Sequence, residues 1–277
     1  MKINGETKII GFFGSTFRTS KMYAMYNAVF EALGLNFVYV PFVVEDVKKG
    51  VEAIRSLGVH AVGVTIPFKI NIMEHLDGLD EDAKRIGAVN VVVNKNGKLI
   101  GGNTDGKGGV KALKEKTMVK GKKIILLGSG GAARALAFAV KDEGGELTIL
   151  NRTLKDAKEL SKRVGCQFGG LEKLSDLMPT TDILINSTSV GMAPEINQSL
   201  VNKKLLHKGL TVMEIISNPR ETKLLKDAQE VGCKVVFADR MLLWQGVLKF
   251  KIYTGIEPPI KIMENALQIT SPYYYGR

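Results

Sequence analysis

The 277-residue sequence predicts an α/β fold made of two domains, and three observations support this prediction. Short apolar segments alternate with helical patterns through the first third of the chain, which is typical of βαβ units in a mostly parallel sheet. A second series of the same kind follows a glycine-rich stretch at 106–109. Within that series a glycine-rich turn stands between a strand and a helix, as in doubly wound nucleotide-binding domains.

In the first series, glycine and proline mark the ends of the predicted elements. Gly34 and Gly58 close two helices, and Pro67 stops the third strand. The turn-forming pair Asn96-Gly97 separates two further strands, so we expect this unit to have an antiparallel edge. The strands are predicted over 8–13, 36–42, 60–66, 89–94 and 98–101, and the helices over 20–33 and 46–57.

The second series is typical of a Rossmann-type domain. After a helix over 110–116, strands are predicted over 123–127, 147–150, 182–186, 210–215 and 234–237. Two helices over 241–254 and 259–268 then close the chain. We therefore expect residues 1–107 to form one α/β domain, to which the helices of 240–277 return, and residues 108–239 to form the Rossmann-type domain.

The composition excludes several other classes of protein. No charge-free apolar run reaches the roughly 18 residues that a membrane span needs, and the N-terminus lacks the apolar core of a secretory signal. Cys166 and Cys233 form neither a disulfide framework nor a zinc-binding spacing, which favours the reducing cytoplasm. His60, His75 and His207 also lack metal-ligand spacing, so we expect no metal.

The net charge of +11 is unevenly distributed along the chain. Residues 108–239 carry a net +6, against +2 for residues 1–107 and +3 for the remainder. A basic field in the middle segment would attract an anionic cofactor. Because no dense basic run is interleaved with aromatic residues, nucleic acid is disfavoured as a partner. We expect a small-molecule partner, no membrane, and a monomer or homodimer.

The segment Gly128-Ser129-Gly130-Gly131-Ala132-Ala133 has the form G-x-G-x-x-A. It follows one predicted strand and opens a helix predicted over 132–140, which is the context that this pattern requires. Gly128 allows the tight turn, and Gly130 lets backbone amides approach a pyrophosphate. The helix N-terminus then faces the phosphates with its partial positive charge. The segment therefore predicts a dinucleotide site.

The end of the next strand distinguishes NAD from NADP. An NAD site usually places Asp or Glu there to hold the ribose hydroxyls. This chain has Asn151-Arg152-Thr153 instead, followed by Lys155. A guanidinium and a hydroxyl suit a 2′-phosphate, and no carboxylate is present to repel it. NADP is therefore the expected cofactor, with NAD as the alternative.

Three short motifs before the nucleotide-binding segment place polar side chains next to predicted strand ends, where α/β sites collect. They are V-T-x-P-x-K at 64–69, G-A-V-N at 87–90 and N-T-D at 103–105. Oxidation of an alcohol needs a group that takes the hydroxyl proton as hydride leaves, and a lysine oriented by a carboxylate can do this. Taken singly, Lys69 would be a surface lysine and Asp105 a helix N-cap.

The wording and order of these motifs resemble the shikimate dehydrogenase family along essentially the whole chain. The resemblance extends to G-x-N-T-D-x-x-G at 101–108, the glycine turn, N-R-T at 151–153, N-x-T-x-x-G-M at 186–192 and M-L-x-x-Q at 241–245. It implies a two-domain oxidoreductase of aromatic amino acid biosynthesis that interconverts 3-dehydroshikimate and shikimate with NADP, or acts on quinate. It also implies that the substrate lies in a cleft between the domains.

Carried over position by position, the resemblance implies a role for individual residues. Lys69 and Asp105 would be the catalytic pair at the reacting hydroxyl. The other substrate-binding residues would be Ser20 for the carboxylate, and Thr65, Asn90 and Gln245 for ring hydroxyls. The cofactor-binding residues would be Gly128, Ser129, Gly130, Gly131, Ala132, Asn151, Arg152 and Thr153, with Thr188 and Met192 beside the nicotinamide.

Two of the expected substrate positions depart from the family pattern. Met22 stands where the family's S-x-S or S-x-T motif has its second hydroxyl, and Ser217 stands where it has a tyrosine. Arg240 also replaces a glycine, and Val91 a threonine. Two hypotheses stay open: an ordinary shikimate dehydrogenase, or a relative that acts on quinate or another small hydroxylated acid. A non-catalytic sensor and a methylene-folate dehydrogenase are further alternatives, which the catalytic pair and the V-T-x-P-x-K wording disfavour.

Overall fold

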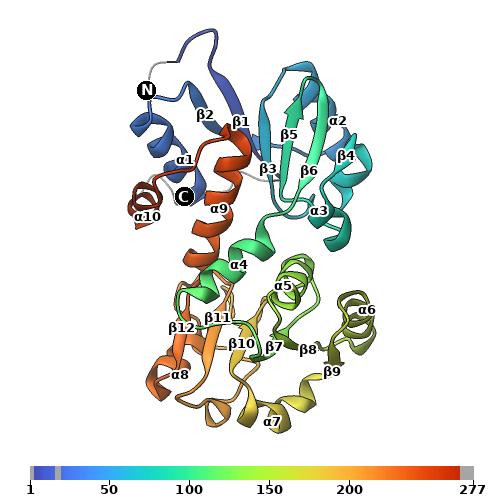
Figure 1. Ribbon diagram of the computed structural model, residues 1–277, viewed down its shortest axis with the longest axis vertical. Helices are drawn as coiled ribbons and strands as arrows, with labels where there is room; N and C mark the ends of the chain where they lie inside the picture. The colour runs from blue at the N-terminus through green and yellow to red at the C-terminus, as the bar shows by residue number, and fades with distance from the viewer. Residues whose placement is uncertain (1–2, 16–19, 269–277) are drawn as a thin grey trace. The chain divides into compact units, whose positions relative to one another are not determined.

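The structure, a computed structural model, describes residues 3–15 and 20–268 (Figure 1). Its contacts divide the chain into two compact units. Residues 105–244 form unit 2, and the described residues before and after them form unit 1. Helix α9 (Ala238–Thr254) is shared, because its residues from Gln245 onward belong to unit 1.

Unit 1 is built on a six-stranded sheet with the strand order β2-β1-β3-β5-β6-β4. Strand β5 runs antiparallel to both of its neighbours, and the other pairs are parallel. The mostly parallel α/β architecture predicted for this part of the chain is confirmed. The strands are β1 (Lys8–Gly14), β2 (Phe37–Val43), β3 (Ala61–Val64), β4 (Gly78–Leu79), β5 (Val91–Lys95) and β6 (Lys98–Gly102).

The predicted antiparallel edge is wrong in its position. Asn96 and Gly97, with φ of 53° and 87°, do form a tight turn that pairs Lys95 with Lys98. However, β5 lies inside the sheet, and the edge beyond β6 is the parallel strand β4. Strand β4 was not predicted, because a strand of two residues has no periodicity that could reveal it.

Side-chain caps begin the helices of unit 1. Ser20, Asp46 and Asp80 accept hydrogen bonds from backbone N–H groups of the first turns of α1, α2 and α3. Gly34 and Gly58 follow α1 and α2 with φ of 63° and 61°, as predicted for glycines that end helices. The helices are α1 (Lys21–Ala32), α2 (Val47–Ser56), α3 (Glu81–Ile86), α10 (Ile260–Gln268) and the 3₁₀ turn η1 (Asn71–His75).

A side chain of α1 covers the outer edge of β2. Val44 N donates to Gly14 O at 2.8 Å. The backbone N–H and C=O groups of the even-numbered residues of this segment therefore point toward β1, and those of the odd-numbered residues point outward. On the outer side, Asn27 accepts from the Tyr39 N–H at 2.8 Å and donates to Tyr39 O at 3.0 Å. Pro41, the next outward residue, has no N–H group.

Unit 2 contains a fully parallel sheet with the strand order β12-β11-β10-β7-β8-β9. Counted within the unit, this is the 3-2-1-4-5-6 order of the Rossmann fold, which confirms the prediction. The order reverses between β7 and β10, and such sheets bind ligands outside the carboxyl ends of the strands at this point. The strands are β7 (Lys123–Leu127), β8 (Glu146–Leu150), β9 (Gln167–Gly169), β10 (Ile183–Asn186), β11 (Thr211–Glu214) and β12 (Lys234–Val236).

Helices cover both faces of this sheet. Ile124 and Leu126 of β7 pack with residues of α4, α5 and α6, whereas Ile125 and Leu127 pack on the other face with residues of α7 and α8. This alternation gives β7 its unbroken apolar sequence. The helices are α4 (Asp105–Lys114), α5 (Gly131–Asp142), α6 (Leu154–Val164), α7 (Leu174–Leu177), α8 (Lys223–Val231) and the 3₁₀ turns η2 (Leu171–Lys173), η3 (Met178–Thr180) and η4 (Lys203–Leu205).

Helix α4 begins at Asp105, not at residue 110 as predicted, and therefore contains the glycine-rich stretch. Glycine weakens a helix, so its presence needs a packing reason. A Cβ on Gly106 would lie 2.2 Å from the backbone O of Ala135 in α5, and one on Gly109 would lie 2.2 Å from Leu136 Cδ2. The glycines allow α4 to pack closely beside α5 (Figure 1).

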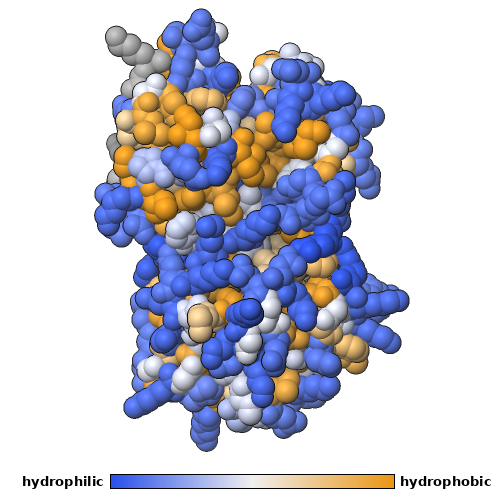
Figure 2. Space-filling view, viewed as in Figure 1, coloured by the Kyte–Doolittle hydropathy of each residue, from blue (hydrophilic) through white to orange (hydrophobic). Residues whose placement is uncertain are grey.

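The two units differ in character on the face that Figure 2 shows. Figure 2 shows hydrophobic residues gathered in a patch on unit 1 and scattered among hydrophilic residues on unit 2. Among the residues that the structure describes, no helix has both the length and the apolar character that crossing a membrane requires.

Candidate active site

The glycine turn leaves β7 at the point where the strand order of unit 2 reverses. Gly128 has a φ of 104°, in the region that favours glycine. A Cβ at this position would also lie only 3.0 Å from Ser187 Oγ, at the end of the neighbouring strand β10. Both the backbone angle and the lack of space therefore require glycine here.

The N-terminus of α5 is shaped to receive an anion. No side chain caps this helix, whose N-cap is Gly130 and whose first residue is Gly131. A Cβ on either glycine would have no atom within 4 Å, so there is space in front of the turn. The N–H groups of Gly131, Ala132 and their neighbours give this end a partial positive charge. An uncapped helix end with open space fits a dinucleotide pyrophosphate.

A polar cavity of about 330 Å³ adjoins the turn. Two guanidinium groups and two carboxylates from α5 and α6 border it, so its lining side chains are charged but carry no net charge. The lining residues are Ser129, Gly130, Arg134, Asp156, Glu159, Leu160 and Arg163.

The segment after β8 contains the residues that were expected to select NADP. Asn151 Nδ2 donates to Thr153 O at 3.1 Å, which fixes the turn between β8 and α6. Arg152 and Thr153 are exposed on this turn. No carboxylate stands at 151–153, so the arrangement fits a 2′-phosphate better than an unmodified ribose.

The loop after β10 carries Thr188 and Met192. Asn186 Oδ1 accepts from the Thr188 N–H at 3.1 Å and from the Thr188 hydroxyl at 2.7 Å, while Thr188 Oγ1 accepts from the Val190 N–H at 3.2 Å. A Cβ on Gly128 would lie 3.2 Å from Thr188 Cγ2, so this loop borders the glycine turn. Met192 is 47% exposed.

Glu214, the last residue of β11, was not predicted as a site residue. Its side chain is fully buried. It accepts hydrogen bonds from Asn186 Nδ2 at 3.2 and 3.0 Å, the Ile216 N–H at 3.1 Å and the Thr222 hydroxyl at 3.1 Å. Burial raises the pKa of this carboxyl above its ordinary value, although the hydrogen bonds act in the opposite direction. An acid at the end of an apolar strand was the signal available in the sequence.

In unit 1, Asn90, Thr104 and Gln245 form one hydrogen-bonded cluster. The fully buried Asn90 accepts from the Thr104 N–H at 2.9 Å, and its Nδ2 donates to Thr104 Oγ1 at 3.1 Å and Gln245 Oε1 at 3.3 Å. The Thr104 hydroxyl also lies 3.3 Å from the Gln245 backbone O, to which it donates. The structure thus joins three distant motifs. Thr104 was missed as a site residue, although it stands inside the N-T-D motif.

Thr65 and Lys69 belong to the segment that follows β3. The start of this segment is held by a backbone hydrogen bond from Val64 N, the end of β3, to Asn90 O at 2.8 Å. The carbonyl of the half-buried Lys69 accepts from the Val89 N–H at 2.7 Å. These backbone bonds hold the V-T-x-P-x-K segment against G-A-V-N.

Asp105 and Ser20 both lie at the beginning of helices. Asp105 follows Thr104 directly, is 4% exposed, and stands where the dipole of α4 favours a carboxylate. Ser20 Oγ accepts from the Met22 N–H at 3.3 Å and so caps α1.

The structure explains one of the two departures at expected substrate positions. Met22 is 2% exposed, and its Cε lies 3.5 Å from the position that a Cβ on Gly246 would occupy. Because this side chain packs in the core of unit 1, an apolar residue suits the position. Ser217 is exposed, and nothing in the structure explains the serine.

Arg240, which replaces the family's glycine, binds a carboxylate of the segment that ends α4. It donates two hydrogen bonds to Glu115, which also accepts from Trp244 Nε1 at 2.7 Å. Lys111 lies over the Trp244 ring, 5.1 Å from its centroid. Trp244 is therefore a packing residue that links α9 to α4.

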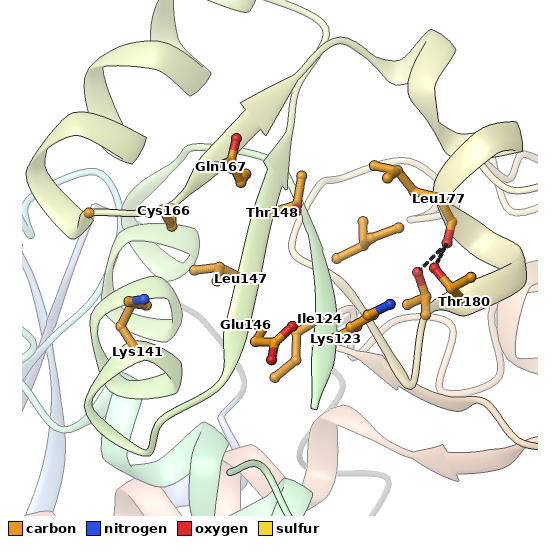
Figure 3. Close-up of a pocket in the computed structure, with 13 residues that line it drawn as sticks. Lys123, Ile124, Lys141, Glu146, Leu147, Thr148, Cys166, Gln167, Leu177 and Thr180 are labelled. Atoms are coloured by element: carbon orange, nitrogen blue, oxygen red, sulfur yellow. Dashed lines mark hydrogen bonds between the residues drawn. The ribbon is translucent and has the colours of Figure 1, made fainter. Parts of the chain in front are cut away.

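A cavity of about 530 Å³ lies at the amino-terminal edge of the unit 2 sheet (Figure 3). Lys123 and Glu146, the first residues of β7 and β8, line it together with Lys141 and Cys166. Burial raises the pKa of the Cys166 thiol to about 11, so the thiol is protonated at neutral pH. None of the predicted site residues lines this cavity, and parallel sheets bind ligands at the opposite edge.

Family models match most of the chain. The shikimate dehydrogenase substrate binding domain matches residues 12–92, and shikimate / quinate 5-dehydrogenase matches residues 111–233. The shikimate 5′-dehydrogenase C-terminal domain matches residues 240–268. The three matches follow the same order as the motifs identified in the sequence.

Individual relatives are similar over nearly their full length. The shikimate dehydrogenase (NADP(+)) of Methanothermobacter thermautotrophicus is 41% identical over 276 residues, which cover 96% of this chain and 98% of the relative. A solved shikimate dehydrogenase in complex with NADP+ is 42% identical with a TM-score of 0.91, covering 96% of each chain. That of Thermus thermophilus, in complex with NADP(H) and shikimate, is 32% identical with a TM-score of 0.87, covering 94% and 98%. This chain therefore belongs to the shikimate dehydrogenase family.

Proposed function

We propose that this chain is an NADP-dependent oxidoreductase that interconverts 3-dehydroshikimate and shikimate in the cytoplasm, on the route to aromatic amino acids. The observation that carries the proposal is the combination of two features: a dinucleotide-binding turn in unit 2, and Lys69 held beside the Asn90 cluster in unit 1. Relatives of this similarity are named for shikimate and NADP(+), which supports shikimate over quinate and over a non-catalytic sensor.

The residues of unit 2 provide the cofactor site in this proposal. Bound NADP supplies the acceptor for the hydride that leaves the alcohol carbon. The glycine turn from Gly128 to Ala132 holds the pyrophosphate on the uncapped end of α5. Asn151 shapes the turn from which Arg152 and Thr153 hold the 2′-phosphate. Thr188 and Met192 border the nicotinamide.

Lys69 moves the proton. In the direction of oxidation its neutral amine takes the proton of the reacting hydroxyl, and in the direction of reduction its ammonium returns that proton. The family resemblance assigns to Asp105 the role of the carboxylate that stabilises the ammonium form. The bond between Lys69 O and Val89 N fixes the backbone from which this side chain extends, and a fixed donor needs less reorganisation during the reaction.

The other polar residues of unit 1 recognise the substrate. Gln245 Oε1 accepts from Asn90, so the Gln245 amide nitrogen points away from Asn90 as a donor for a ring hydroxyl. Thr65 and Asn90 complete the set that binds hydroxyl groups. Ser20, at the N-terminus of α1, offers a hydroxyl and a positive helix end to the substrate carboxylate.

The test is the reduction of NADP followed by absorbance, with purified protein and shikimate at mildly alkaline pH. Lys69→Ala should lower kcat by about 10²–10⁴-fold, the usual contribution of general acid–base catalysis. Lys84→Ala removes an exposed lysine of the same unit and should leave kcat unchanged. Turnover that survives Lys69→Ala would contradict the catalytic role, and bound NADP without turnover would reject shikimate as substrate.

A further inference from the structure

Glu214 is the centre of a buried chain of hydrogen bonds at the carboxyl edge of the unit 2 sheet. The chain runs from Thr222, the N-cap of α8, through Glu214 to Asn186, and from Asn186 to Thr188. Glu214 is 0% exposed, Thr222 is 0% exposed and Asn186 is 3% exposed. These hydrogen bonds therefore connect three segments: the loop after β10, the loop after β11 and the beginning of α8.

In this series of hydrogen bonds, the direction of each bond from donor to acceptor is fixed. Asn186 Oδ1 accepts from both the N–H and the hydroxyl of Thr188, so the amide cannot turn over without losing two bonds. Asn186 Nδ2 therefore faces Glu214, where it lies within 3.2 Å of both carboxylate oxygens. The Ile216 N–H and the Thr222 hydroxyl supply the remaining donors. Only a group that accepts on both of its oxygens satisfies all these donors.

We propose that Glu214 is a positioning residue for the nicotinamide half of the cofactor. By accepting from Asn186, it holds the loop of Thr188 and Met192 in the shape described above. The proposal rests on the proposed function only in taking these two residues as neighbours of the nicotinamide. Glu214 touches neither substrate nor cofactor, and its effect passes through Asn186.

Binding measurements on Glu214→Gln separate this role from a general structural one. Whichever way the introduced amide turns, its oxygen can still accept from Asn186 Nδ2, but its NH₂ group faces the same nitrogen. One of the two contacts that anchor the loop is therefore replaced by a contact between two donors. Binding of NADP, measured by calorimetry, should weaken by about 10-fold, the effect of one lost buried hydrogen bond. Adenosine 2′,5′-bisphosphate lacks the nicotinamide half and reaches only from Arg152 to the glycine turn, so its affinity should stay unchanged.

Two further variants complete the experiment. Asn186→Asp combined with Glu214→Gln reverses donor and acceptor across this contact while the net charge stays the same as in the native chain. This double variant should recover most of the lost NADP affinity. Glu221→Gln changes an exposed glutamate on the segment after β11 and should leave both affinities unchanged.

Equal weakening of NADP and of the bisphosphate in Glu214→Gln would overturn the proposal, because it would indicate general unfolding of the site. Unchanged NADP affinity, or a double variant no better than Glu214→Gln alone, would overturn it as well. These binding measurements need no turnover. If the native protein binds NADP but does not oxidise shikimate, the proposed function is rejected. The role of Glu214 can still be tested, because the test measures NADP binding alone.

Discussion

Replacing Gly106 by alanine should destabilise unit 2 and displace the beginning of α4. The new Cβ would lie 2.2 Å from Ala135 O and 2.8 Å from Ala135 C, whereas ordinary contacts begin at 3.4 Å. Because the obstacle is the backbone of α5, the two helices must move apart. Overpacking costs about 1–3 kcal/mol, and a backbone obstacle places this case near the upper end of that range. The better helix propensity of alanine offsets up to about 1 kcal/mol. The net loss of about 2 kcal/mol should lower Tm by about 4–8 °C.

Gly109 provides a matched control on the same helix. A Cβ there would meet Leu136 Cδ2 at 2.2 Å, which is the end of a side chain that can change rotamer. Gly109→Ala should therefore cost about 1 kcal/mol or less. Thermal melts followed by circular dichroism compare the two variants. Gly106→Ala should also lower kcat, since Asp105 is its neighbour. Equal melting temperatures for the two variants, or a Gly106→Ala protein that melts like the native chain, would refute the reasoning from backbone contact.

Three further predictions concern the cofactor, the unit 1 cluster and pH. Arg152→Ala should raise KM for NADP by about 10- to 100-fold and leave KM for NAD nearly unchanged; steady-state kinetics with both cofactors check this, and equal effects would contradict it. Asn90→Ala leaves the buried Thr104 N–H without its acceptor and should cost about 1–3 kcal/mol in urea unfolding, unlike an exposed substitution such as Asn197→Ala. For Glu115, burial raises the pKa, but hydrogen bonds from Arg240 and Trp244 outweigh it and leave the pKa below its ordinary value of 4.5. A lowered pKa means that the ionised form stabilises the fold above the unfolded-state pKa and that this contribution is lost as pH falls. The difference in Tm between the native chain and Glu115→Gln should therefore be largest at neutral pH and shrink as the pH falls below 4.5; a difference that grows in acid would contradict this.

Local signals predicted most of the fold. Strand β7 was expected over 123–127 and is found over those residues, because an apolar run bounded by charged residues and glycine is a local pattern. The glycine turn and the hairpin at Asn96-Gly97 were predictable for the same reason, since each depends on the φ angles of one or two residues. The early beginning of α4 was not predictable, because only the approach of α5 explains glycines inside that helix.

Local patterns could not assemble the candidate site. Asn90 and Gln245 are 155 positions apart, and no periodicity relates residues at that distance. Only the resemblance of several motifs to one family placed them in a common site. Thr104 and Glu214 remained without a role because their importance lies in which donors and acceptors surround them, and that depends on tertiary structure.

The contact of Asn27 with Tyr39 affects how copies of this chain can associate. An exposed edge strand is a template on which another molecule can add a strand, and this is a common route to aggregation. The Asn27 amide presents a donor and an acceptor to β2 in place of a neighbouring backbone, and it already occupies both polar groups of Tyr39. An incoming strand would have to displace this side chain and would then meet Pro41, which offers no donor. One asparagine and one proline therefore protect this edge from growing into an intermolecular sheet.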